Sequence, residues 1–430
     1  MRRRVKGNDV MLETSRKLLI VGAFFMPMLA FRIAGQQTAT TNTGLTVSDA
    51  FFFLSAGFLA LSIRRRKIPP TPLWNIGAVL VVLGGLGSCY FADIFLASLF
   101  VVARMIFVLV VWQISMRYLV DNERWMTLVI TAYVAGCAVS GFVAILQLEF
   151  HLFLAEGGLV NGRAFGLAHH PDDTGSFLAL GLTFATALAL HPRVKRQWYH
   201  IGFIALIAIG LIVSGSVSGM ICALGGSMFV LLRRGIKVSR LIGVTVVLVG
   251  VYAGGIAIQG GNGKSSLNPI ARFKKATGAE NGGGNSVTPR IGTIKGAWDG
   301  IVDDPVFGHG LDVISSLTYL DRNVNVEYPT HNFILMAWFQ GGIFFLIGDL
   351  ICIGEALRRM IKGKRDPTKD MLLAGALAVI VFALQAPMMF DRYFWFPFVL
   401  AMTLRGGPVH GVPGELPAEE TADAAPPALA

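Results

Sequence analysis

Charged residues are scarce in this chain. Lys, Arg, Asp and Glu make up 15% of its 430 residues, whereas hydrophobic residues make up 54%. Soluble domains contain about 25% charged residues, so the composition excludes an ordinary soluble domain. Long stretches also lack the polar and apolar alternation of soluble helices and strands, and segment 241–258 carries no charge at all. These properties predict a polytopic integral membrane protein.

Cysteine is scarce as well, with four residues in the whole chain. All four lie inside apolar runs, without the paired spacing of a zinc site or the loop placement of a disulfide framework. We therefore interpret them as small packing residues. They are Cys89, Cys137, Cys222 and Cys352.

Apolar runs of about 17–25 residues are long enough for a helix to cross about 30 Å of hydrocarbon. About twelve runs approach or reach this length, which predicts an all-α bundle of transmembrane helices. No cleavable signal peptide is evident, so the first run is expected to be an uncleaved span. The predicted spans are 18–34, 47–63, 73–92, 94–114, 126–147, 174–190, 201–213, 218–232, 241–258, 332–353, 371–388 and 393–404.

Basic residues predict the orientation of these spans. They cluster after every second span, for example at 64–67 and 358–369, whereas segment 35–48 has none. Cytoplasmic loops of membrane proteins are enriched in Lys and Arg. The pattern therefore predicts an even number of spans with both termini in the cytoplasm. It also explains the net charge of +11 without a nucleic-acid partner.

Two longer loops are expected on the opposite side, at 148–173 and 259–331. The second loop separates spans nine and ten and divides the chain into 1–258, 259–331, 332–405 and a disordered tail at 406–430. A loop of this length without a function would be unusual. Within it, the segment from Thr288 to Val302 has helical spacing, with Pro289 in a plausible first turn.

Arginines in these outer loops are candidates for binding a phosphate. Arg163 lies in the shorter loop and Arg290 in the longer one. A guanidinium binds phosphate oxygens in a bidentate manner, so both would suit a lipid-linked diphosphate. The alternative for each is a surface charge or a salt bridge to a nearby aspartate.

His331, at the mouth of the tenth span, is a candidate general base, because a neutral imidazole can accept a proton near pH 7. The alternative is an interfacial histidine.

Arg104 lies in the middle of a span, where an ionised residue is costly and usually faces the bundle interior. It is expected to pair with a buried acid or to contribute to a diphosphate pocket.

A metal site is not expected. His169 with His170, and Asp172 with Asp173, are adjacent in sequence rather than one helical turn apart, so their side chains do not converge easily on one ion. No cofactor is predicted from the remaining residues.

Several of these motifs, in this order, resemble the O-antigen ligase/polymerase family. The resemblance covers residues 140–404 and is strongest in the long loop. Arg290 and Trp298 of the long loop are followed by DPVFGHGL (304–311), by His331 with Asn332 at the start of the tenth span, and by QGGI (340–343) within that span. The other matching motifs are GRAFGLAHHPDDTG (162–175), SGSVSG (214–219) and DRYFWFP (391–397). Asp172 replaces an asparagine common in the family, and the serine-rich turn lacks the family's arginine.

The resemblance implies a GT-C-like membrane glycosyltransferase in the bacterial inner membrane, with its active site facing the periplasm. The enzyme would be inverting and metal-independent. Its donor would be a glycan linked to undecaprenyl diphosphate. Its acceptor would be either a growing glycan, for an exopolysaccharide or O-antigen polymerase, or lipid A-core, for a ligase in lipopolysaccharide biosynthesis.

The resemblance also implies roles for individual residues. Arg290 and His331 would be catalytic. The diphosphate or glycan would be bound by Arg163, Arg290, Arg104, Trp298 and Asn332.

A transporter or flippase is the alternative from another class. Such a protein would usually carry charged residues inside the bundle and show internal pseudo-symmetry. Here the unusual residues lie mainly in loops, which favours an enzyme. The discriminating observation is whether Arg163, Arg290 and His331 converge at the outer face.

Overall fold

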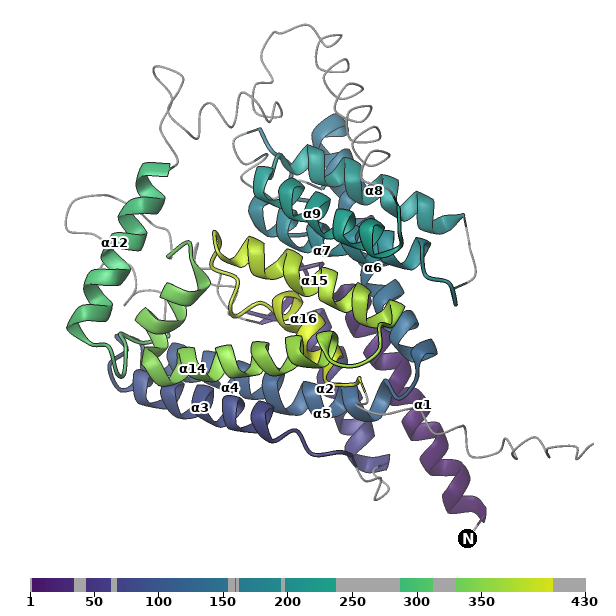
Figure 1. The fold of residues 1–430 in the computed structure, drawn as a ribbon, viewed down its shortest axis with the longest axis horizontal. Coiled ribbons are helices and arrows are strands. Elements are labelled where there is room, and N and C mark those ends of the chain that lie inside the picture. Colours follow the sequence, from purple (N-terminus) through teal and green to yellow (C-terminus); the bar gives the residue numbers. More distant parts are fainter. Residues whose placement is uncertain are drawn as a thin grey trace, which may run out of the picture.

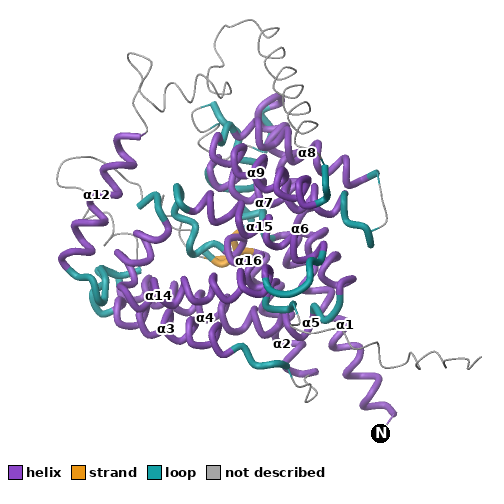
Figure 2. Tube along the Cα trace, viewed as in Figure 1, coloured by secondary structure: helices purple, strands orange, loops and turns teal. Residues whose placement is uncertain are grey.

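The computed structural model describes residues 2–34, 44–62, 68–153, 159, 162–194, 198–236, 287–311 and 330–404. Helices dominate this part of the chain, and the strands within it are β1 (Arg32–Ala34) and β2 (Leu45–Thr46), which pair in antiparallel fashion (Figure 2). The helices are α1 (Arg2–Phe25), α2 (Val47–Ser62), α3 (Pro72–Cys89), α4 (Phe95–Ile106), the π-helix η1 (Phe107–Trp112), α5 (Gln113–Leu119), α6 (Glu123–Phe150), α7 (Pro171–Ala189), α8 (Tyr199–Ser214), α9 (Val217–Arg233), α12 (Val287–Asp303), α14 (Phe333–Ile361), α15 (Pro367–Ala383) and α16 (Arg392–Ala401).

Each predicted span within the described residues coincides at least in part with a helix, and the ninth, 241–258, lies outside them. Four described helical stretches are long and apolar enough to cross a membrane, namely α3, Phe95–Leu119, α6 and α14. Shorter apolar helices are α2, α8 and α9. The protein is thus a helical, multi-pass membrane protein, and the total of about twelve spans stays a prediction.

The first predicted span is wrong at its end. It was expected to continue to residue 34, but α1 ends at Phe25 and the chain then turns into β1. Pro27 explains the difference, because the residue before a proline is disfavoured in the helical conformation. A contact with the loop before α7 also fixes this turn, because the Ala30 N–H donates to the Leu167 carbonyl at 2.8 Å.

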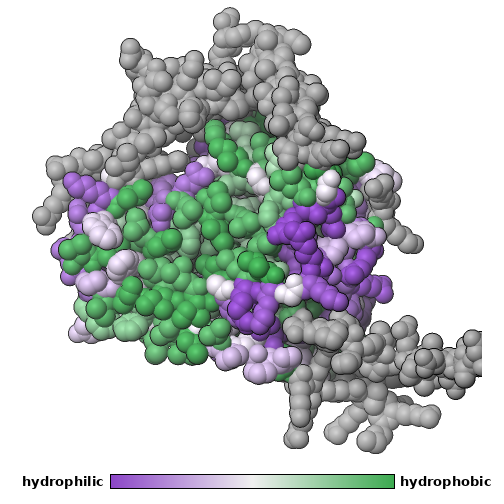
Figure 3. Space-filling model, viewed as in Figure 1, coloured by the Kyte–Doolittle hydropathy of each residue, from purple (hydrophilic) through white to green (hydrophobic). Residues whose placement is uncertain are grey.

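Figure 1 shows most of the helices running in a similar direction, with α12 lying across one end of the bundle. Figure 3 shows a broad hydrophobic surface on this face, with hydrophilic side chains toward its edges. Such a band is what the hydrocarbon core of a bilayer requires.

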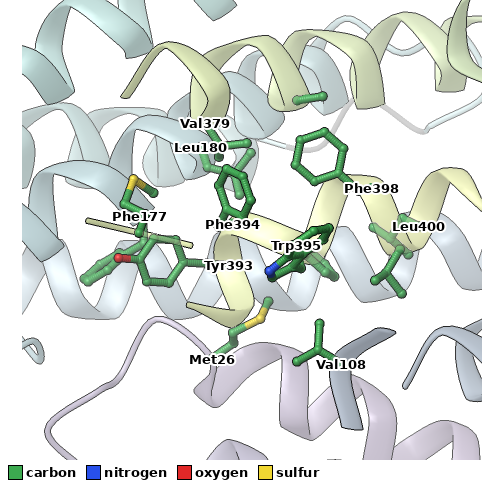
Figure 4. Close-up of a cluster of buried hydrophobic side chains, with 14 of the residues drawn as sticks. Met26, Val108, Phe177, Leu180, Val379, Tyr393, Phe394, Trp395, Phe398 and Leu400 are labelled. Atoms are coloured by element: carbon green, nitrogen blue, oxygen red, sulfur yellow. The ribbon is translucent and has the colours of Figure 1, made fainter. Parts of the chain in front are cut away.

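Helix α16 lies in the interior of the bundle. All ten of its residues are buried, and its aromatic side chains pack against α7, α15, η1 and Met26, which directly follows α1 (Figure 4). At ten residues it is about 15 Å long, half the thickness of the hydrocarbon core. A helix that is hydrophobic all round is a buried helix, and this one forms the core around which the longer helices pack.

Bonds between loops divide into two groups. At the end that the charge pattern assigns to the cytoplasm, loops are joined by Arg16–Asp121, Arg193–Glu123, Arg193–Asp366 and Arg117–Thr71. At the other end they are joined by Ala30–Leu167, Arg163–Ser214, Leu311–Ser98 and Asn332–Leu384. Each of these bonds connects loops or helix ends that the sequence predicted on the same side. Among the described residues the contacts therefore agree with the predicted alternation, and the assignment of sides stays a prediction.

Candidate active site

The loop between α6 and α7 is shaped by buried polar side chains. The Gln147 carboxamide, fully buried, accepts from the N–H groups of Phe165 and Gly166 at 3.1 and 2.8 Å and donates to the Gly166 carbonyl at 2.8 Å. Gly166 has φ +55°, and a Cβ there would lie 2.6 Å from the Ser140 carbonyl oxygen. These bonds fix the backbone at residues 165 and 166, close to Arg163.

Arg163 is 7% exposed and joins three parts of the fold. Its Nε donates to the Ser214 carbonyl, at the end of α8, at 2.7 Å. Its Nη2 forms an ion pair of 2.6 Å with Asp172, in the first turn of α7. The salt bridge considered as an alternative for Arg163 is thus present, while its role toward a diphosphate stays a prediction.

A second arginine–aspartate pair lies at the start of α16. Arg392 and Asp49 are 3% and 4% exposed and form an ion pair. Asp49 also accepts from the Thr46 N–H at 2.7 Å. A buried ion pair is stable only when further hydrogen bonds satisfy its charged groups. Here β2 supplies that hydrogen bond through Thr46, and α2 supplies Asp49 itself.

Further charges lie beside this pair. Asp391 is 6% exposed and accepts from the Tyr393 hydroxyl at 2.7 Å. Arg104 interacts electrostatically with Asp391, and the expected pairing of Arg104 with a buried acid stays a prediction. Asp173 interacts with Asp391 and with Arg32 of β1. The π-helix η1 begins three residues after Arg104, and such irregular turns occur frequently at functional sites.

These ion pairs and longer-range electrostatic interactions group eight charged side chains, which we call the arginine–aspartate cluster. Asp172 and Asp173, adjacent in sequence, connect its two halves. Its members are Arg32, Asp49, Arg104, Arg163, Asp172, Asp173, Asp391 and Arg392. Three members of the cluster, Arg32, Asp49 and Asp173, had no role predicted from the sequence. A charged residue inside or beside an apolar run was the available signal for each.

The adjacent histidines stabilise the loop. His169 Nε2 lies 2.7 Å from the Leu29 carbonyl. Burial, together with the nearby charge of Arg32, lowers the pKa of His169 to about 4, so this imidazole is neutral at pH 7 and Nε2 donates the bond. His170 is the N-cap of α7, because its Nδ1 accepts from the Asp172 N–H at 3.2 Å. Burial also lowers the pKa of His170.

The predicted helix of the long loop is α12, and it confirms the expected span of Thr288 to Val302 within a residue at each end. Arg290 lies in its first two turns, and the side chain of Arg290 is outside the described part. Ala297 and Ile301 pack against Phe339 of α14. Trp298 is half-exposed and meets Trp338 of α14 edge-on, with ring centroids 6.2 Å apart.

The segment DPVFGHGL docks into a break in α14. At Gly342 the backbone leaves the helical conformation, with φ +73° and ψ −179°. The N–H groups of His309 and Gly310 donate to the freed carbonyls of Phe339 and Gln340 at 2.9 and 3.1 Å. Ser88 of α3 joins both partners, donating to the Gln340 carbonyl and accepting from the Gly310 N–H. Two separate sequence motifs, 304–311 and 340–343, therefore form a single joint.

His331 and Asn332 begin α14 beside the loop between α15 and α16. The Asn332 Oδ1 accepts from the N–H groups of Ile334 and Leu335 at 3.0 and 3.1 Å, which makes Asn332 the N-cap. Its Nδ2 donates to the Leu384 carbonyl at 3.3 Å. His331, directly before it, is half-buried. The same loop leads to Asp391, so the fold brings His331 to the end of the bundle that holds Arg163.

Comparison with known proteins agrees with the sequence motifs. Residues 202–348 match the sequence model of a family described as O-antigen ligase. The match includes α8, α9, α12 and the first half of α14, and hence Arg290, Trp298, His331 and Asn332. Arg104, Arg163 and Asp391 lie outside it. No curated protein matches the chain.

Proposed function

We propose that the chain is a membrane glycosyltransferase of the O-antigen ligase/polymerase family with a polyprenyl-diphosphate-linked glycan donor, and the match of residues 202–348 to the O-antigen ligase model supports this proposal. The single observation that carries the proposal is a juxtaposition. The family-matched start of α14, with His331, lies at the same end of the bundle as the arginine–aspartate cluster. Arginines in fixed positions suit the two phosphates of the donor.

The reaction joins a sugar carbon to an acceptor oxygen. The bond between the anomeric carbon and the diphosphate oxygen breaks, and polyprenyl diphosphate leaves with the electron pair. The acceptor hydroxyl attacks the anomeric carbon from the opposite face, which inverts the configuration. Its proton passes to the imidazole of His331, acting as general base.

The arginines stabilise the leaving group in this mechanism. Arg163 and Arg290 bind the diphosphate and neutralise the charge that develops as the glycosidic bond breaks. Arg104, inside the bundle, adds positive charge near the site where the diphosphate binds. Asn332 orients the backbone at the start of α14, and the sequence-predicted glycan contact of Trp298 has no part in this mechanism.

Turnover and donor binding, measured separately on purified variants, test these roles. Arg290→Ala is expected to lower the rate by about 10²–10³-fold, the usual effect of losing one preorganised charge contact. Arg290→Lys should restore little, because an ammonium cannot replace a bidentate guanidinium. His331→Ala should lower the rate by about 10²–10⁴-fold while donor binding stays close to that of the native protein.

A matched control is Arg193→Ala. Arg193 is 59% exposed at the other end of the bundle and pairs with Glu123. Its loss should leave transfer unchanged, since exposed ion pairs are worth about 0–1 kcal/mol. If His331→Ala retains near-native turnover, the assignment of His331 as general base is wrong.

The acceptor separates the two enzymes within the family. We favour a polymerase, which extends a growing glycan, over a ligase acting on lipid A-core. The family description, O-antigen ligase, favours the second candidate. An assay with lipid-linked repeat units decides between them. Chain growth without lipid A-core indicates a polymerase, and transfer that requires lipid A-core indicates a ligase.

A further inference from the structure

Helix α12 presents three distinct faces. The first is buried against α14 and consists of Thr293, Ala297 and Ile301, each at most 2% exposed. These positions recur every four residues, as expected for one side of a helix. This face attaches α12 to the bundle. The other two faces do not pack against α14.

The second face is apolar but exposed. Ile294, Trp298 and Val302 are 37%, 50% and 63% exposed, again at a spacing of four. The third face is polar and exposed, and it carries Lys295, Asp299 and Asp303. An exposed apolar stripe beside a polar stripe is typical of a helix that lies in a membrane interface.

Exposed apolar side chains follow the stripe in sequence and reach the end of α3. After α12, the half-exposed Phe307 stacks on Phe91, with ring centroids 5.6 Å apart. Phe307 also lies over Gly87 of α3, where an added Cβ would be 3.0 Å from its ring. The outward side of α3 is itself apolar and exposed at Leu73, Ile76, Val79, Leu83 and Leu86, and Tyr90 follows at 84%.

The chemistry of α3 identifies what covers this surface. As a helix able to cross a membrane, α3 presents its exposed leucines, valine and isoleucine to lipid. The exposed apolar residues at the end of α3, with Phe307 packed on them, lie at the depth of the lipid head groups, and α12 closely precedes Phe307 in the chain. Tryptophan and tyrosine are enriched at that depth, as Trp298 and Tyr90 are here.

The orientation of α12 agrees with this position. Figure 1 shows α12 running across the direction of α3 and the second half of α14. If α3 crosses the membrane, α12 lies roughly along the membrane surface. A helix in that orientation buries its apolar face about 5–10 Å into the boundary between head groups and acyl chains.

We propose that α12 is an interfacial helix whose Ile294–Trp298–Val302 stripe is inserted into the outer leaflet of the bilayer. The polar stripe faces the water outside. The bilayer itself is the partner, and α14 holds the helix from the remaining side. This role is independent of the proposed reaction, since it needs only a membrane-embedded protein.

Spin labels at single cysteines test the insertion in the full-length protein, reconstituted into nanodiscs of phosphatidylethanolamine and phosphatidylglycerol. Trp298→Cys and Val302→Cys report on the apolar stripe. Lys295→Cys and Asp299→Cys are matched controls on the same helix. The four native cysteines, which are all buried, are first replaced by alanine, so that each variant carries a single label.

Collision with oxygen, which concentrates in lipid, is compared with collision with a water-soluble nickel chelate. The ratio of the two is expected to be severalfold higher at positions 298 and 302 than at 295 and 299. Equal ratios at all four positions would place the stripe in water and overturn the proposal. Low collision with both reagents at 298 and 302 would mean that protein covers the stripe, which overturns it as well.

Discussion

At the start of α14, the Asn332 carboxamide is hydrogen-bonded at both ends. Asn332→Ala is expected to destabilise the protein by about 1 kcal/mol, the usual effect of losing an N-cap. Asn332→Asp should lose less, because its carboxylate still caps α14, although it no longer donates to the Leu384 carbonyl. Thermal unfolding in detergent measures both variants.

Activity separates this structural role from the predicted glycan contact. If Asn332→Asp is as stable as expected but transfers glycan slowly, the amide N–H also binds substrate. Native turnover in a stable Asn332→Asp would contradict the predicted role of Asn332 as a binding residue.

His169 gives the fold a dependence on pH. Its pKa is about 4 in the folded protein and about 6.5 in an unfolded chain. Between these values the unfolded chain takes up a proton that the folded protein excludes. The free energy of unfolding should therefore fall as pH is lowered from about 6.5 toward 4.

His169→Gln should weaken this dependence, measured as the difference in unfolding midpoint between neutral and acidic buffer. His151→Gln, at an exposed histidine near the same loop, is the control and should keep it. An unchanged dependence in His169→Gln would mean that other groups cause it.

Among the elements, α14 depends on its break at Gly342. The φ of +73° with ψ −179° is essentially restricted to glycine, and an added Cβ would lie 2.1 Å from the Val306 carbonyl oxygen. Gly342→Ala should therefore destabilise the protein by at least about 1–3 kcal/mol and displace segment 304–311. Because this joint connects α12 to the start of α14, glycan transfer should fall with it.

Gly354 provides the comparison within the same helix. Nothing lies within 4 Å of a Cβ added there. Gly354→Ala should be neutral or stabilising by about 0.5–1 kcal/mol, the usual gain within a helix. Equal unfolding midpoints for the two variants would contradict a special role for the break.

For the whole molecule, the prediction concerns topology. A cysteine at position 285, in the long loop, should react with a membrane-impermeant reagent in intact cells whose outer membrane is permeabilised. A cysteine at position 66, in a basic loop, should react only after the inner membrane is opened. Burial of the native cysteines keeps the background low. Labelling of position 66 from outside would overturn the assignment of sides.

The sequence alone determined the class of the fold and the order of its helices. Runs such as 126–147 and 332–353 are long enough for a helix to cross the hydrocarbon core of a bilayer. Within lipid, a single apolar segment satisfies all its backbone hydrogen bonds only as a helix. Basic loops predicted which helix ends lie together, and the loop contacts agree. Local preference was also sufficient for α12, where Pro289 lies in the first turn. These features depend on residues close together in the chain.

Only the tertiary structure decided which apolar helices face lipid and which are buried. Lipid tails and a protein interior are equally apolar, so composition did not separate the buried α16 from the exposed side of α3. The same holds for charges. Arg163 donates to the Ser214 carbonyl, and Arg392 pairs with Asp49, across long separations in sequence. Such pairs form because a buried charge requires a partner, and packing, not sequence distance, determines which partner is near.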